Sequence, residues 1–302
     1  MRILHCAFTI AFLSIPALGE ESGPVAYWTF DDIRVERRPV DMERGETFIP
    51  KEKFAYVREE ISGTEQDLNG IYYESVSGIN GRALLLDGYT THVAPNEEQT
   101  AYVSGDFSVE AWIALGAYPK NWCPIVDHQR PVSDGDFRGY FFGIDALGRT
   151  MFRIATRGKE DVLVHAERIP LKTWTHVACV YGADRGMEIY INGKRVSTSK
   201  PNLPFSAVDP EWYFETPVLI GKSRTRHRPY GTIRPHGTME SHTFLDGLLD
   251  ELKIYDRALD ETEMAAAYTK SRTTAAPRLP QRILPAGPQG PARFGAIHAN
   301  LK

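Results

Sequence analysis

The chain has 302 residues, of which 42% are hydrophobic and 25% are charged, so it can bury one sizeable core and carry additional segments. We therefore expect one main domain. The formal net charge of −4 gives no general attraction for phosphates, which excludes nucleic acid as a partner and leaves only local basic sites for anions.

Residues 1–19 have the pattern of a secretory signal peptide. A single Arg2 precedes an apolar run over residues 3–15, and small residues occupy the two positions that a signal peptidase reads. A membrane anchor is the alternative, but the run is too short and Pro16 interrupts it. We predict that the segment is cleaved, that no membrane span remains, and that the protein is secreted, to the extracellular space or the periplasm.

The cysteines leave two possibilities open. Cys6 lies in the predicted signal peptide, so Cys123 and Cys179 remain as an even pair in an oxidising compartment, and a disulfide between them is one prediction. Two buried free thiols are the alternative, because Cys179 lies in the apolar segment 177–181 and cysteine is among the most buried residue types.

The mature sequence begins with a strand signal and then becomes highly charged. Residues Val25–Asp31 are β-branched and aromatic and end at an acidic pair, which predicts a strand. Between Ile33 and Leu68, 16 of 36 residues are charged and no periodicity is sustained. Such a segment cannot supply a core of its own, so we expect an irregular insertion over residues 33–68.

Strand signals then follow one another along the chain. In Phe107–Ile113 apolar and polar residues alternate, so one face of that strand is expected to be core. Further strands are predicted over residues 81–88, 91–94, 125–127, 139–144, 151–155, 218–222 and 244–255.

A hairpin is the clearest local signal. Asn192 and Gly193 separate the apolar runs 174–181 and 187–191 from a third strand over 194–198, and an Asn-Gly pair tolerates positive φ at both turn positions. Near the end, Asp260 and Glu263 have the spacing of a capping box, which predicts a short helix.

These segments carry a family resemblance. The hairpin contains every letter of a Trp-x-His-Val-Ala and Tyr-x-Asn-Gly-Lys pattern, and the final strand matches Gly-x-x-Asp-Glu-x-x-x-Tyr-x-Arg-Ala-Leu. Over residues 24–270 the chain resembles the laminin-G-like, concanavalin A-like jelly-roll domains. The resemblance implies an all-β fold, a two-sheet antiparallel sandwich with one short C-terminal helix, over residues 20–272. The matching residues of the final strand are Gly247, Asp250, Glu251, Tyr255, Arg257, Ala258 and Leu259.

The C-terminal part has a different composition. Five prolines interrupt any regular element in residues 273–292, which predicts a linker. Residues 293–302 become apolar again, and we expect them to begin a further domain that continues beyond Lys302.

The sequence predicts no enzyme. Glucanases of this fold use a strand with Glu-x-Asp-x-Glu, whose carboxylates flank the scissile bond, and no such triplet occurs. Glu110 stands alone, and Asp250 and Glu251 are neighbours that we expect to point to opposite faces of a strand. His176 and Cys179 are three positions apart on a strand, so we expect them on opposite faces as well, where they cannot act together as base and nucleophile.

The resemblance implies one structural calcium ion, because many lectin-like sandwiches hold calcium with six to eight oxygen ligands. Asp31 at the end of the first strand and Asp250 in the last are the candidate ligands, and Asp87 is a weaker third. Hydrogen bonds from these carboxylates to backbone amides at the sheet edge are the alternative.

A basic stretch over residues 222–242 is the candidate ligand site. It holds five Lys or Arg and three His against one Glu. Arginine suits carboxylate or sulfate, and a tyrosine ring can stack on a sugar. A solvated loop that pairs with the acidic residues of the insertion 33–68 is the alternative. The candidate ligand-binding residues are Arg224, Arg226, Arg228, Tyr230, Arg234 and His236.

Two classes of function fit these patterns. The first is a secreted, non-catalytic recognition module for a glycan, including an acidic one, or for an extracellular protein. The second is a structural or adhesive spacer in a larger extracellular protein, whose catalytic domain, if it has one, lies beyond residue 302.

Overall fold

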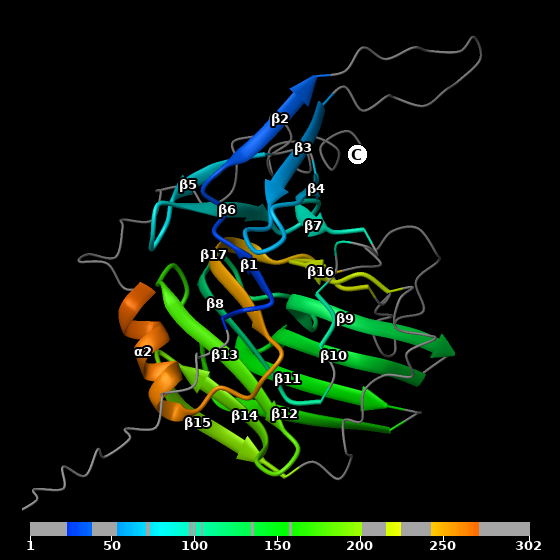
Figure 1. The fold of residues 1–302 in the computed structure, drawn as a ribbon, viewed down its shortest axis with the longest axis vertical. Coiled ribbons are helices and arrows are strands. Elements are labelled where there is room, and N and C mark those ends of the chain that lie inside the picture. The colour runs from blue at the N-terminus through cyan, green and yellow to red at the C-terminus, as the bar shows by residue number, and fades with distance from the viewer. Residues whose placement is uncertain are drawn as a thin grey trace, which may run out of the picture.

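The computed structural model describes residues 23–37, 53–70, 73–96, 99, 101–103, 105–133, 136–156, 159–200, 216–224 and 243–271. In this part of the chain, 17 strands form two antiparallel sheets, and one helix lies beside them (Figure 1). The two-sheet jelly-roll sandwich predicted from the sequence is therefore confirmed. The predictions for residues 1–19, 273–292 and 293–302 lie outside the described residues.

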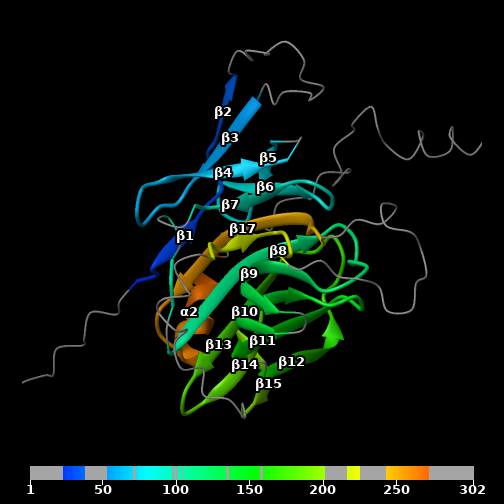
Figure 2. The ribbon, with the colours of Figure 1, turned by 90° about the vertical axis from the view of Figure 1, so that its right-hand side faces the viewer.

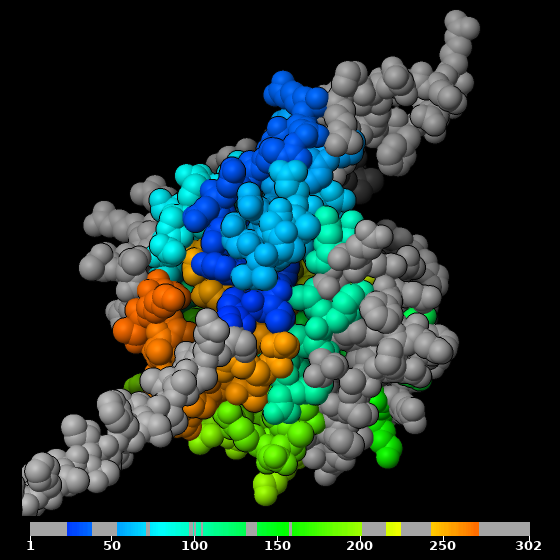
Figure 3. Space-filling view, viewed as in Figure 1, coloured from blue at the N-terminus to red at the C-terminus, as the bar shows by residue number. Residues whose placement is uncertain are grey.

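Sheet A has eight strands in the order β15, β14, β13, β8, β17, β6 and β5, with β1 paired to β17. The first and last strands thus lie side by side at the surface (Figure 3). The strands of sheet A are β1 (Ala26–Trp28), β5 (Ser75–Ser77), β6 (Arg82–Asp87), β8 (Phe107–Leu115), β13 (Thr175–Gly182), β14 (Gly186–Ile191), β15 (Lys194–Ser199) and β17 (Asp246–Tyr255).

Sheet B has nine strands in the order β12, β11, β10, β9, β16, β7, β4, β3 and β2. They are β2 (Ile33–Arg37), β3 (Lys53–Arg58), β4 (Glu65–Asn69), β7 (His92–Ala94), β9 (Cys123–Ser133), β10 (Asp136–Ile144), β11 (Arg149–Thr156), β12 (Lys159–Arg168) and β16 (Leu219–Ile220).

The main hydrophobic core contains residues of both sheets. In sheet B, one row of directly paired residues carries this core from strand to strand, because residues paired across strands share a face. The row runs through Leu163, Phe152, Phe142, Val126, Ile220, Val93, Leu68 and Ala55 to Val35. Every member is buried except Val35 on the edge strand β2, which is 45% exposed.

The charged insertion is not irregular where the structure describes it, and that expectation was wrong. Strands β2, β3 and β4 extend sheet B, and β2 and β3 project away from the other strands (Figures 1 and 2). In β3, buried Ala55 and Val57 alternate with more exposed residues, which is the period of a half-buried strand. The high charge belongs to the outward positions. Strands β5 and β12 were also not predicted.

The hairpin prediction is confirmed. Asn192 and Gly193 have φ values of 51° and 74°, and β14 pairs with β15 beyond them. Gly193 also lies against the helix, where an added Cβ would come within 2.9 Å of the Cβ of Tyr268. A side chain at this position would therefore collide with the helix.

Helix α2 (Glu261–Ser271) begins at the predicted capping box. Glu263 N donates to Asp260 Oδ1 at 2.8 Å, and Asp260 N donates to Glu263 Oε2 at 2.7 Å. The helix covers part of the outer face of sheet A (Figure 1). There the ring of Tyr268 stacks on Trp112, with 5.4 Å between the ring centres. No helix in the described part of the chain is long and apolar enough to cross a membrane.

Cys123 and Cys179 do not form the predicted disulfide. Both are free and buried, Cys123 at the start of β9 in sheet B and Cys179 on β13 in sheet A. Burial raises the pKa of both thiols, so they remain protonated at neutral pH. The alternative of two buried thiols describes the structure.

Candidate functional site

The outer face of sheet A contains a closed network around Glu110. This carboxylate is 1% exposed, accepts a hydrogen bond from Tyr255 OH at 2.8 Å, and lies 3.0 Å from His176 Nε2. Burial alone would raise the pKa of Glu110, but the bond to His176 and the charges of His176 and Lys253 outweigh it and lower the pKa to about 2. The partners of Glu110 keep its carboxylate ionised, so the network contributes to the structure of the sheet.

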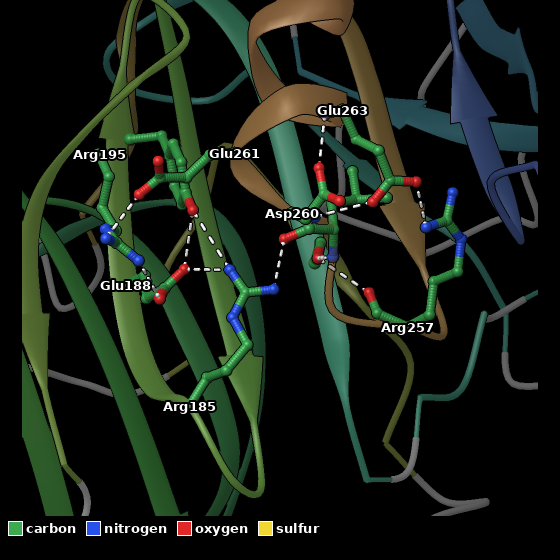
Figure 4. A network of polar contacts seen from close by, with 10 residues as sticks. Arg185, Glu188, Arg195, Arg257, Asp260, Glu261 and Glu263 are labelled. Carbon is green, nitrogen blue, oxygen red and sulfur yellow. Dashed lines mark hydrogen bonds and ion pairs between the residues drawn. The ribbon is translucent and has the colours of Figure 1, made fainter.

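A second buried carboxylate anchors the hairpin beneath the helix. Glu188 accepts hydrogen bonds from Arg185 Nη2 at 2.6 Å and from Arg195 Nη1 at 3.0 Å. Arg195 also pairs with Glu261 in the first turn of α2, as Figure 4 shows. The arginines on this face therefore have carboxylate partners, and the network holds α2 on the sheet.

Asp250 and Glu251 do not point to opposite faces, and that prediction was wrong. Glu251 has a φ of 52°, and the pairing of β17 with β8 shifts register between Asp250 and Lys253. This β-bulge directs both side chains to Asn80, whose backbone N donates to Asp250 Oδ2 at 3.2 Å and whose Nδ2 donates to Glu251 Oε1 at 3.2 Å. An alternating strand pattern does not reveal such a bulge.

Asp31 and Asp250, two of the three candidate calcium ligands, lie against the turn at residues 79–82. Asp250 Oδ2 accepts from Ile79 N at 2.6 Å, and Asp31 Oδ1 accepts from Arg82 N at 2.6 Å. Asp87 is likewise engaged, by the backbone amides of residues 89, 90 and 91. These are the amide hydrogen bonds that we gave as the alternative to a metal ion.

One carboxylate oxygen at this turn has no hydrogen-bond partner in the part of the chain that the structure describes. Asp250 Oδ1 is buried without a hydrogen bond, and burial raises the pKa of Asp250 to about 8. The described residues include no group of three or more His, Cys, Asp or Glu that could hold a metal. Asp250 thus offers calcium one oxygen once its proton is displaced, and the ion stays a prediction.

The outer face of sheet B is built differently. The register places Arg153, Phe141, Asp127 and Leu219 in one row across β11, β10, β9 and β16, on the face opposite the core row. Asp127 is fully buried. Its Oδ1 accepts from Gln129 N at 3.1 Å and its Oδ2 from Arg224 N at 2.7 Å.

Aromatic rings surround the arginine of this row. The guanidinium carbon of Arg153 lies 5.0 Å from the ring centre of Trp122 and 5.9 Å from that of Phe141. Arg153 also donates to Gln129 Oε1 and pairs with Glu160 Oε2 at 3.2 Å. Trp122 is partly exposed.

A second cation and ring lie next to this row. Lys222 Nζ is 3.4 Å from His92 Nε2 and 5.5 Å from the ring centre of Phe244. Lys222 and Phe244 face each other in an isolated β-bridge, and both are partly exposed. We call the following residues the sheet B cluster: His92, Trp122, Asp127, Gln129, Phe141, Arg153, Lys222, Arg224 and Phe244.

Only one of the predicted ligand-binding residues can be placed. Arg224 lies in the sheet B cluster, where its Nη2 donates to the carbonyl of Pro217. Arg226, Arg228, Tyr230, Arg234 and His236 lie outside the described residues. Trp122 and Arg153 were missed, although Arg153 interrupts an otherwise apolar strand and so signalled an outward polar position.

Comparisons with known proteins agree with this fold. A family model named Laminin_G_3, described as the Concanavalin A-like lectin/glucanases superfamily, matches residues 87–265. The chain belongs to this superfamily. No curated protein matches this concanavalin A-like chain.

Solved structures similar to this concanavalin A-like chain include domains of larger proteins. The binding domain of Paraclostridial Mosquitocidal Protein 1 has 17% identity and a TM-score of 0.50, over 71% of this chain and 49% of that one. The binding domain of botulinum neurotoxin serotype G has 12% identity and a TM-score of 0.49, over 82% and 51%. Our chain thus spans about half the length of these toxin structures.

A third similar structure is domain 4 of AbnA, an extracellular GH43 arabinanase from Geobacillus stearothermophilus, in complex with arabinotriose. It has 17% identity and a TM-score of 0.47, over 82% of this chain and 98% of that one. At such identities the likeness is one of fold.

Proposed function

We propose that this chain is a secreted, non-catalytic module that binds a glycan through the sheet B cluster. The observation that carries the proposal is the arrangement of partly exposed rings, Trp122 and Phe244, beside cationic donors on the sheet face that points away from the core. Membership of a lectin-containing superfamily supports a binding role, and the signal pattern of residues 1–19 supports secretion.

The chemistry of the cluster suits a sugar. An aromatic face packs against the apolar C–H side of a pyranose or furanose ring, while N–H donors fix its hydroxyl groups. Here the rings and the donors come from separate strands and loops of one sheet face, so a sugar lying on that face would meet both.

The carboxylates of this face support a role without catalysis. Retaining glycoside hydrolases place two carboxyl groups about 5–5.5 Å apart, each able to reach the scissile bond. Both oxygens of Asp127 accept backbone amides, and Glu160 pairs with Arg153. These two carboxylates are therefore engaged in the structure of the sheet.

The test is a glycan array with the full chain, followed by calorimetry on the best glycan with Trp122→Ala and Trp122→Phe. We expect Trp122→Ala to weaken binding about tenfold, and Trp122→Phe, which keeps an aromatic face, to retain most of it. The far-ultraviolet circular dichroism spectrum of each variant should match the wild type. Unchanged affinity in Trp122→Ala would place the glycan elsewhere, and no binding by the wild type to any glycan would leave the spacer function.

A further inference from the structure

The charges of the sheet B cluster do not balance. Arg153 has Glu160 as its ion-pair partner, whereas both oxygens of Asp127 accept hydrogen bonds from backbone amides. Lys222 and Arg224 have no carboxylate within ion-pair distance among the described residues. Lys222 is thus without a counter-charge in this part of the chain, and the charge of Asp127 acts on Arg224 without an ion pair between the two side chains.

The cluster also has more buried hydrogen-bond donors than acceptors to receive them. Gln129 is 1% exposed, and its Nε2 has no acceptor in the described part of the chain. Arg224 Nε is likewise buried without an acceptor. Both atoms are donors. A buried donor without a partner costs free energy, so these two atoms favour a group that brings oxygen acceptors.

The surroundings disfavour the cations further. Burial lowers the pKa of Lys222, and the charge of Arg224 lowers it again. Burial also lowers the pKa of Arg224, and the charge of Asp127 offsets this only in part. A negative charge between the two side chains would reverse this effect, because an opposite charge at close range favours the charged form.

Resting on the proposed glycan site, we infer that the ligand is an anionic glycan whose carboxylate or sulfate group binds between Lys222 and Arg224. The Nζ of Lys222 and the guanidinium of Arg224 donate to its oxygens, and charge-assisted bonds of this kind are the strong ones. Phe244, 5.5 Å from Lys222 Nζ, lies where the sugar ring that carries the anion can pack.

The experiment compares three polysaccharides on the full chain by calorimetry at low salt. Polygalacturonate supplies carboxylates, dextran sulfate supplies sulfates, and dextran is neutral. The variant Lys222→Gln with Arg224→Gln removes both charges, and Lys194→Gln with Arg168→Gln is the matched control. The control removes the same charge from exposed residues outside the cluster.

We expect at least one anionic polymer to bind, the cluster variant to bind it at least about tenfold more weakly, and the control variant to bind as the wild type does. Added sodium chloride should weaken this binding. The polymer that binds distinguishes carboxylate from sulfate. Lys222→Gln alone, which removes no hydrogen bond to the backbone, keeps the test valid if the double variant does not fold.

Other outcomes overturn the inference. Binding of dextran or other neutral glycans together with no anionic binding, or anionic binding that the cluster variant leaves unchanged, would refute the anionic site while the glycan function stands. If a glycan array that contains all three classes detects no ligand for the folded wild type, the proposed function fails and the inference fails with it.

Discussion

The outer faces of the two sheets handle charge in opposite ways. On sheet A, buried Glu110 and Glu188 each meet a basic or hydroxyl partner, and Arg185 and Arg195 each meet a carboxylate. On sheet B, Lys222 and Arg224 form no ion pair with a carboxylate in the described part of the chain, and both oxygens of buried Asp127 accept hydrogen bonds from backbone amides.

This difference separates two uses of the same residue types. Burying a charge is costly, so on the face that holds the helix Glu110 and Glu188 are paired with basic side chains of the same sheet. A face that leaves cations unpaired retains that cost until something else supplies the counter-charge. Removing a paired charge from sheet A is therefore expected to lower the free energy of unfolding. Removing an unpaired cation from sheet B is expected to lower the affinity for a ligand.

The largest effect expected on the sheet A face is that of Glu110→Ala. Removing one partner of a buried ion pair leaves His176 and Lys253 without their carboxylate, which typically costs about 3–5 kcal/mol. Urea unfolding measures this loss. Glu167→Ala, at an exposed position of β12, is the control and should cost less than about 0.5 kcal/mol. If Glu110→Ala and Glu167→Ala lose the same free energy of unfolding, the charge pairing on sheet A does not stabilise the protein.

Acid should remove the contribution of Glu110. The pKa of Glu110 is about 2 in the folded protein and 4.5 ordinarily, so the unfolded chain binds its proton more readily. The stabilisation is complete above about pH 4.5 and is lost as the pH falls towards 2, with a magnitude of about 3 kcal/mol. Glu110→Gln should therefore lose less stability than the wild type between pH 5 and pH 2. Parallel pH profiles would contradict this expectation.

Calcium should act at the one unpartnered carboxylate oxygen of Asp250. A ligand that binds only the folded state stabilises it by about 2.7 kcal/mol at a hundredfold excess over its dissociation constant. We expect calcium to raise the melting temperature of the wild type and to have no effect on Asp250→Asn. If the melting temperature is the same in chelator and in calcium, the prediction of a structural calcium ion is wrong.

The smallest effect concerns the helix that covers sheet A. Asp260→Ala removes the acceptor for Glu263 N and should cost about 1 kcal/mol. Asp256→Ala removes an exposed carboxylate just before the helix and is the control. Because α2 lies on the other face of the sandwich, glycan binding should not change. A loss of binding in Asp260→Ala would mean that the two faces are coupled.

Much of the fold could be predicted from local signals. The Asn192–Gly193 turn, the capping box at Asp260 and the apolar strands each depend on a few consecutive residues, and all of them are present. Strands β2 to β4 were missed because they lie in a densely charged segment without sustained periodicity, and only the alternation in β3 and β4 identifies them as half-buried.

The candidate site could not be predicted in the same way. Trp122, Arg153 and Lys222 are separated by tens of residues, and only the register of β9, β10, β11 and β16 brings them to one face. The bulge at Glu251 is a second example. Its positive φ reflects contacts with a distant turn and has no local sequence signature.

The position of β17 has a consequence for how the protein is made. This strand lies inside sheet A, between β8 and β6 and next to β1, yet it is the last strand of the sandwich along the chain. Until Tyr255 has been synthesised, β8, β6 and β1 have no central partner, and the sheet remains open in the middle. Folding of the sandwich therefore follows synthesis of the whole domain.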